Sequence, residues 1–123
     1  MIVDDNKIDR YVIEMVVKKG NFSKDVVQTE SGIEALNFLE SHDEAGWPDV
    51  ILLDINMPGM NGFEFMDKYA TFPEALTSGC AVYMLTTSIH PLDIDKAINN
   101  KYIIKFINKP LNMARLKELN EGE

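Results

Sequence analysis

The sequence predicts an α/β fold in which helices cover both faces of a five-stranded parallel sheet. Five short apolar runs alternate with segments of helical periodicity, which is the (βα)5 pattern. Two of the runs, residues 50–53 and 81–85, are apolar at consecutive positions, as expected for strands with helices on both faces. Such a sheet is doubly wound, and its usual order with five strands is 2-1-3-4-5.

The individual elements follow from the spacing of apolar residues. We expect strands at residues 1–3, 25–28, 50–53, 81–85 and 103–107. The first helix is expected to end at Gly20 in a left-handed conformation. Apolar residues that recur every three or four positions define the buried faces of five helices, namely Ile8, Val12, Met15 and Val16; Ile33, Leu36 and Leu39; Phe65, Met66 and Tyr69; Ile94, Ala97 and Ile98; and Leu116 with Leu119.

Composition limits the class of protein. With 123 residues, 46% of them hydrophobic, we expect one domain over residues 1–123 with a real core. The net charge of −8 would repel nucleic acid and anionic lipid, so neither is an expected partner. No apolar run approaches the ~20 residues that a membrane span needs. Cys80 is the only cysteine, and we expect a buried, reduced thiol in a cytoplasmic protein.

Polar residues gather where the expected strands end. Their carboxyl ends share one edge of a parallel sheet, which is where doubly wound proteins bind ligands. Each residue taken singly has an ordinary explanation, such as a helix start or a solvated surface, but their joint placement favours a functional site. The residues at these strand ends are Asp4, Asp5, Asp54, Thr86, Thr87 and Lys109.

Three carboxylates at one edge would repel one another unless a cation lay among them. Mg²⁺ prefers oxygen ligands and is usually bound by one or two carboxylates together with phosphate oxygens. A carboxylate in such a site can act as a nucleophile and form an aspartyl phosphate. Asp54 at the tip of its strand is therefore the candidate nucleophile, with Lys109 as a positive charge and a threonine hydroxyl as a hydrogen-bond donor.

Four motifs give the chain a family resemblance. "MIVDDN", "VILLDINMPGMNG", "YMLTTS" and "FINKP" occur in the order seen in receiver domains of two-component response regulators, and the chain resembles them along its whole length. The resemblance implies a flavodoxin-like fold and a single-domain regulator. It also implies that Asp54 is the phosphoacceptor. Asp5 would be the main Mg²⁺ carboxylate, assisted by Asp4, and the backbone carbonyl of Asn56 would complete the protein ligands.

The same resemblance implies a switch and its partners. Thr86 would move onto the phosphoryl group, Lys109 would pair with it, and Pro110 would follow a cis peptide bond. Phe106 occupies the aromatic switch position, although it could also be a core residue. A sensor histidine kinase or a histidine phosphotransfer protein would donate the phosphoryl group. A downstream target protein would bind the surface of the fourth helix, fifth strand and fifth helix.

Three alternatives stay open at this point. Thr87 would give the spacing to Lys109 that is more usual in receiver domains, although "YML" before Thr86 favours Thr86 as the strand end. A magnesium-dependent phosphohydrolase would need a general acid two residues after its nucleophile, where this chain has Asn56, so a signalling module is expected and not an enzyme. A flavin-binding protein is disfavoured because the loop after the first strand is acidic.

Overall fold

A computed structural model describes residues 1–87 and 90–121 of the chain. Its five strands form one parallel sheet in the order β2-β1-β3-β4-β5, which confirms the predicted doubly wound α/β fold. The predicted start of the second strand at residue 25 is wrong, because pairing with β1 begins at Gln28. The strands are β1 (Ile2–Val3), β2 (Gln28–Thr29), β3 (Val50–Leu53), β4 (Ala81–Thr86) and β5 (Ile103–Asn108).

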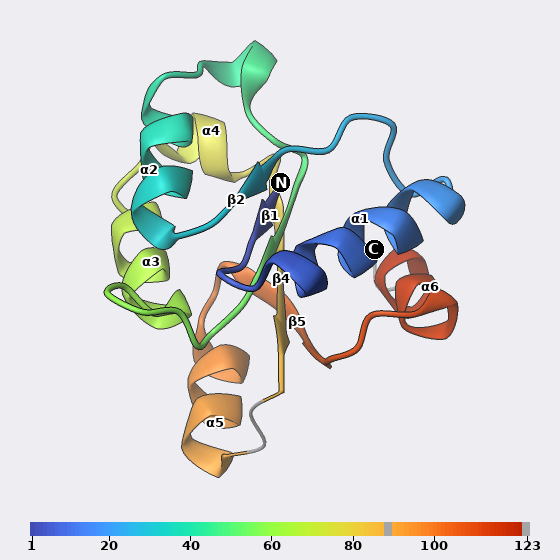
Figure 1. Cartoon of the computed structure of the whole chain (residues 1–123). Helices are drawn as coiled ribbons and strands as arrows, with labels where there is room; N and C mark the ends of the chain where they lie inside the picture. Colours follow the sequence, from blue (N-terminus) through green and yellow to red (C-terminus); the bar gives the residue numbers. More distant parts are fainter. Residues whose placement is uncertain (88–89, 122–123) are drawn as a thin grey trace.

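Helices cover the sheet on both sides (Figure 1). On one face lie α1 (Lys7–Lys19) and α6 (Met113–Glu121), and on the other lie α2 (Gly32–Glu40), α3 (Gly62–Tyr69) and α5 (Pro91–Asn99). Two short elements were not expected from the sequence, the 3₁₀-helix η1 (Glu44–Gly46) and helix α4 (Glu74–Thr77). Within the described residues, no helix is long and apolar enough to span a bilayer.

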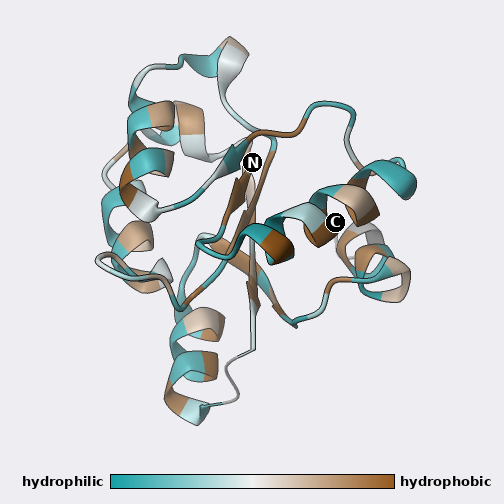
Figure 2. Ribbon diagram, viewed as in Figure 1, coloured by the Kyte–Doolittle hydropathy of each residue, from teal (hydrophilic) through white to brown (hydrophobic). Residues whose placement is uncertain are grey.

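The sheet separates two hydrophobic cores because successive side chains of a strand point to opposite faces. Leu53 and Met84 belong to the core under α2, α3 and α5, whereas Leu52 and Tyr83 belong to the core under α1 and α6. In Figure 2 the central strands β1 and β3 are coloured largely as hydrophobic, β2 is hydrophilic, and the helices carry both colours. Burial on both faces explains why β3 and β4 are apolar at consecutive positions.

The buried face of α1 differs from the predicted one. Ile8 and Met15 are 73% and 48% exposed, and the helix instead buries Arg10, Ile13 and Val17. Residues 10, 13 and 17 also have helical spacing, so either of two faces of the helix could have been buried. The second face allows Arg10 to form a buried hydrogen bond to the backbone carbonyl of Asp4. In α2 and α5 the predicted buried face is wrong at one position each, because Ile33 of α2 and Ile98 of α5 are exposed.

Two local predictions around the helices also need correction. The left-handed residue after α1 is Asn21, with φ 55°, and Gly20 has an ordinary φ of −83°. Gly20 is instead a point of close approach, since a Cβ there would collide with the side chain of Leu116 on α6. Cys80 is free but only partly buried, because it lies just before β4, whose first residue Ala81 is also only partly buried.

Candidate functional site

Asp54 follows β3 directly and is 6% exposed. Its backbone N–H donates to the carbonyl of Val3 on β1 at 2.9 Å, so the parallel ladder continues to this residue. The loop that follows returns across the strand end, where the N–H of Gly62 donates to the carbonyl of Ile55 at 2.8 Å. A Cβ on Gly62 would lie 2.5 Å from the Asp54 carbonyl oxygen, so only glycine permits this approach.

Asp4 and Asp5 extend from the end of β1, next to the end of β3. Asp4 is 1% exposed, and its carboxylate accepts the N–H of Asn6 at 2.9 Å, whereas Asp5 is exposed. One oxygen from each of Asp4, Asp5 and Asp54 lies within 4.8 Å of the others. The three carboxylates that the sequence placed at one sheet edge are therefore clustered.

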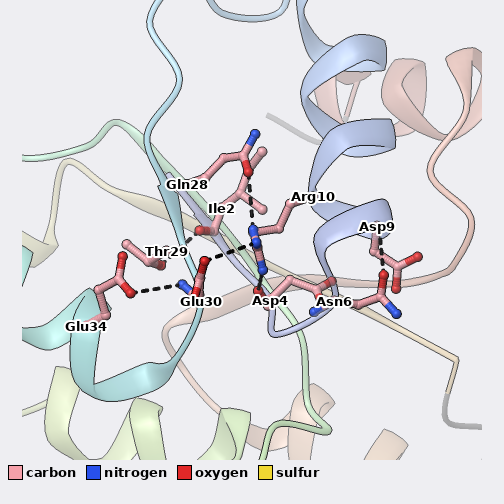
Figure 3. A network of polar contacts seen from close by, with 9 residues as sticks. All are labelled: Ile2, Asp4, Asn6, Asp9, Arg10, Gln28, Thr29, Glu30 and Glu34. Carbon is pink, nitrogen blue, oxygen red and sulfur yellow. Dashed lines mark hydrogen bonds and ion pairs between the residues drawn. The ribbon is translucent and has the colours of Figure 1, made fainter.

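Arg10 ties this acidic loop to β2, as Figure 3 shows. Its Nη1 donates to the backbone carbonyl of Asp4 at 2.8 Å, and its Nε donates to Gln28 at 3.2 Å. Its Nη2 lies 3.4 Å from a carboxylate oxygen of Glu30. The guanidinium is buried, and these acceptors compensate for the hydrogen bonds to water that its charge loses on burial. Arg10 was not among the residues predicted from the sequence, in which only its helical spacing to Ile13 indicated that it could be buried.

Lys109 reaches the acidic cluster from the loop after β5. Its N–H donates to the carbonyl of Thr86 at 2.9 Å, and the Lys109–Pro110 peptide bond is cis. The Nζ atom lies 2.6 Å from Asp4 Oδ2, 2.8 Å from Asp9 Oδ2 and 3.6 Å from Asp54 Oδ2. Asp9, on the first turn of α1, is a second residue that the sequence reading missed. The sequence feature that could have identified Asp9 is its position, since it is an acidic residue in the first turn of a helix that starts at the sheet edge.

The site favours the neutral, protonated form of Asp54 compared with an aspartate in water. Burial, opposed by the charge of Lys109 and reinforced by that of Asp4, raises the pKa of Asp54 from 3.8 to about 6. The backbone N–H of Asn56 donates to the Asp54 carboxylate and acts in the opposite direction. Burial alone would lower the pKa of Lys109, but its hydrogen bonds to Asp4 and Asp9 raise it above the usual value. The lysine is therefore fully charged at neutral pH.

The candidate switch residues lie beside the cluster on β4 and β5. Thr86 ends β4 and is completely buried, whereas Thr87 is exposed. Phe106 pairs with Met84, which is on the same face of β4 as Thr86, and it packs against the core on that side. Ser88 and Ile89, which follow Thr87 in the sequence, lie outside the described residues.

The donor set fits a hard divalent cation. All candidate ligands are oxygens, two of the three carboxylates are buried, and their mutual repulsion contributes to the raised pKa of Asp54. A cation among them would remove that repulsion, and Mg²⁺ prefers such oxygen ligands. The site therefore belongs to the class in which an acidic cluster and a lysine surround a carboxylate at the carboxyl edge of a doubly wound sheet.

Comparison with known proteins places the chain in a family. The family model for the response regulator receiver domain matches residues 1–121, and the chain belongs to this family, whose members are phosphoacceptor modules of two-component signalling. Receiver domains bind Mg²⁺ at an acidic site of this kind. The fold and the strand-end cluster thus agree with the family that the four motifs resembled.

Individual relatives support the same assignment. A response regulator receiver protein from Dyadobacter fermentans is 36% identical, with a TM-score of 0.86 and coverage of 98% of this chain and 92% of that one. A two-component response regulator from Cytophaga hutchinsonii is 29% identical, with a TM-score of 0.89 and coverage of 98% and 91%. The nitrate/nitrite response regulator NarL of Escherichia coli is 29% identical over all of this chain and 55% of its own length. The chain spans about half the length of the curated relatives it matches.

Proposed function

We propose that residues 1–123 form one receiver domain in which Asp54 accepts a phosphoryl group from a sensor histidine kinase or a histidine phosphotransfer protein. The observation that carries this proposal is the position of Asp54 between the carboxylates of Asp4 and Asp5 and the ammonium of Lys109. Three carboxylates could bind a cation, and the cation together with Lys109 could bind a phosphoryl group. A purely structural ion pair would need only one carboxylate and the lysine.

The reaction is a displacement at phosphorus. An Oδ atom of Asp54 attacks, the P–N bond of the donor phosphohistidine breaks, and its electron pair returns to the imidazole nitrogen. Asp54 attacks as the carboxylate, so protonation of this side chain would slow the reaction. Lys109 stabilises the negative oxygens that develop. Mg²⁺ bound to Asp5, Asp54 and the carbonyl of Asn56, with Asp4 beside it, would neutralise the phosphoryl oxygens.

The product would act through a change of surface. A phosphoryl group adds roughly −1.5 to −2 charges and new acceptor oxygens, which can draw the Thr86 hydroxyl toward Asp54. Movement of Thr86 would leave space on the face that Phe106 shares, and Phe106 would turn inward. The surface formed by α5, β5 and α6 would then bind a downstream target protein. Phosphorylation can shift the equilibrium between the arrangements with Phe106 turned outward and inward only if the phosphoryl group interacts more favourably with one of them.

Intact-mass measurement tests the acceptor. After incubation with Mg²⁺ and acetyl phosphate, the chain should carry one phosphoryl adduct that is stable in acid and labile in base. The adduct should be absent from Asp54→Asn and from a sample treated with a chelator. An adduct that persists in Asp54→Asn would contradict the assignment.

Amide NMR tests the switch separately. Thr86→Ala should still be phosphorylated but should lose most of the phosphorylation-induced shift changes across residues 103–107. Thr87→Ala is the matched control, since it removes the same hydroxyl from an exposed neighbour. If Thr86→Ala keeps the wild-type changes, or if Thr87→Ala abolishes them, Thr86 is not the switch.

A further inference from the structure

Asp9 contacts the ammonium of Lys109 without belonging to the acidic cluster of Asp4, Asp5 and Asp54. Its Oδ2 lies 2.8 Å from Lys109 Nζ, nearly as close as Asp4 Oδ2 at 2.6 Å. Among the described residues, the acids whose oxygens could share one ion are Asp4, Asp5 and Asp54, and Asp9 is not in that group. Its contact with Lys109 therefore needs an explanation of its own.

The first turn of α1 fixes the position of Asp9. Asn6 caps this helix, and its side chain accepts the backbone N–H of Asp9 at 3.0 Å, as Figure 3 shows. An acid in the first turn also interacts favourably with the helix dipole. The Asp9 side chain is 40% exposed, whereas that of Lys109 is 9% exposed. Asp9 is thus a well-anchored carboxylate at the rim of the site, and it reaches inward to a buried cation.

The distances around Lys109 indicate a competition. An ammonium group has three N–H donors, and the distances to Asp4 and Asp9 are those of charge-assisted hydrogen bonds. The 3.6 Å to Asp54 Oδ2 is too long for such a bond. We propose that Asp9 is a positioning residue that holds Lys109 on the α1 side of the site, in competition with Asp54 and its phosphoryl group. This proposal rests on the proposed function of Asp54.

The competition sets the direction of the effect. Lys109 must approach the phosphoryl oxygens to stabilise them, and any shift of its ammonium toward Asp54 weakens the contact with Asp9. Asp9 therefore lowers the rate at which Asp54 is phosphorylated. Because the carboxylate is partly exposed, its removal in Asp9→Asn should raise the rate about threefold, within the range of partly exposed ion pairs.

The first measurement uses metal-free, unphosphorylated protein and therefore does not depend on phosphoryl transfer. The ¹⁵Nζ resonance of Lys109, recorded by heteronuclear NMR, should shift in Asp9→Asn. It should stay close to the wild-type position in Asp9→Glu, which keeps the charge. Glu14→Gln is the matched control, since it removes an acid of α1 that contacts Lys18 and Gln28 instead. An unchanged resonance in Asp9→Asn would overturn the positioning role, whatever the phosphorylation results.

The second measurement is the rate of phosphorylation by acetyl phosphate with Mg²⁺, followed by intact mass. Asp9→Asn should be about threefold faster than wild type, while Asp9→Glu and Glu14→Gln should match wild type. In a Lys109→Gln background the acceleration should vanish, because Asp9 acts through Lys109. Equal acceleration in both backgrounds would show that Asp9 acts only through its own charge and would overturn the proposal, as would an unchanged rate in Asp9→Asn. Failure of every variant and of the wild type to be phosphorylated would instead refute the proposed function.

Discussion

Replacement of Asp54 by asparagine should stabilise the metal-free protein at neutral pH. The folded-state pKa of Asp54 is raised, chiefly by burial, to about 6 from an ordinary value of 3.8. Between these two pH values the folded state binds more protons at this residue than the unfolded state does. Stability therefore falls as pH rises through this window, and above about pH 6 the folded protein bears the full cost of a buried carboxylate. The amide that Asp54→Asn introduces carries no such charge.

The pKa values give the size of the effect. The difference between 3.8 and about 6, at about 1.36 kcal/mol for each pH unit, corresponds to about 3 kcal/mol. Between pH 4 and pH 7 the stability of Asp54→Asn relative to that of wild type should therefore increase by about 2 to 3 kcal/mol. A bound divalent cation would offset the cost, so the measurement requires a chelator.

Urea unfolding followed by fluorescence measures this directly. Trp47 is the only tryptophan and is 8% exposed, so its emission reports on unfolding. Asp67→Asn is the control, because it makes the same substitution at an exposed position of α3. The stability difference between Asp54→Asn and wild type should grow between pH 4 and pH 6 and then level off. A difference independent of pH, or a variant that loses stability as pH rises, would refute the electrostatic description of the site.

Three other predictions follow from single contacts. Gly62→Ala should destabilise the fold by about 1 to 3 kcal/mol in urea unfolding, because its Cβ would press on the Asp54 carbonyl; an unchanged midpoint would contradict that approach. Arg10→Met should cost about 1 to 3 kcal/mol through the lost hydrogen bond to the Asp4 carbonyl, and unaltered stability would show that bond to be dispensable. Asp5→Ala should weaken Mg²⁺ binding in calorimetry more than Asp4→Ala, since direct ligation outweighs support of a ligand; equal affinity in wild type and Asp5→Ala would exclude Asp5 as a ligand.

The sheet and the acidic cluster could be predicted because local sequence patterns encode them. Consecutive apolar residues at 50–53 and 81–85 identify strands buried on both faces, and that arrangement determines where the residues after them lie. Asp54, Asp4 and Lys109 each follow a strand in the sequence. Their meeting in space follows from the parallel topology alone.

The rotation of α1 could not be predicted in the same way. Residues 8, 12 and 15 form one helical stripe and residues 10, 13 and 17 form another, and apolar content favours the first. The structure buries the second, which includes a charged residue, and its hydrogen-bond partners lie on β2 and just after β1. Asp9 was missed for a related reason, since its partner Lys109 is 100 positions away and no local pattern links the two.

The most direct test of the central claim is to identify the phosphorylated residue chemically. Borohydride reduces an acyl phosphate of aspartate to homoserine, so treatment of the phosphorylated protein leaves a permanent mark that peptide sequencing by mass spectrometry can locate. The account predicts homoserine at position 54 only, and only when both Mg²⁺ and a phosphodonor were present. Reduction at Asp4, Asp5 or Asp9 with Asp54 unmodified, or phosphate found on His42 or His90, would contradict it.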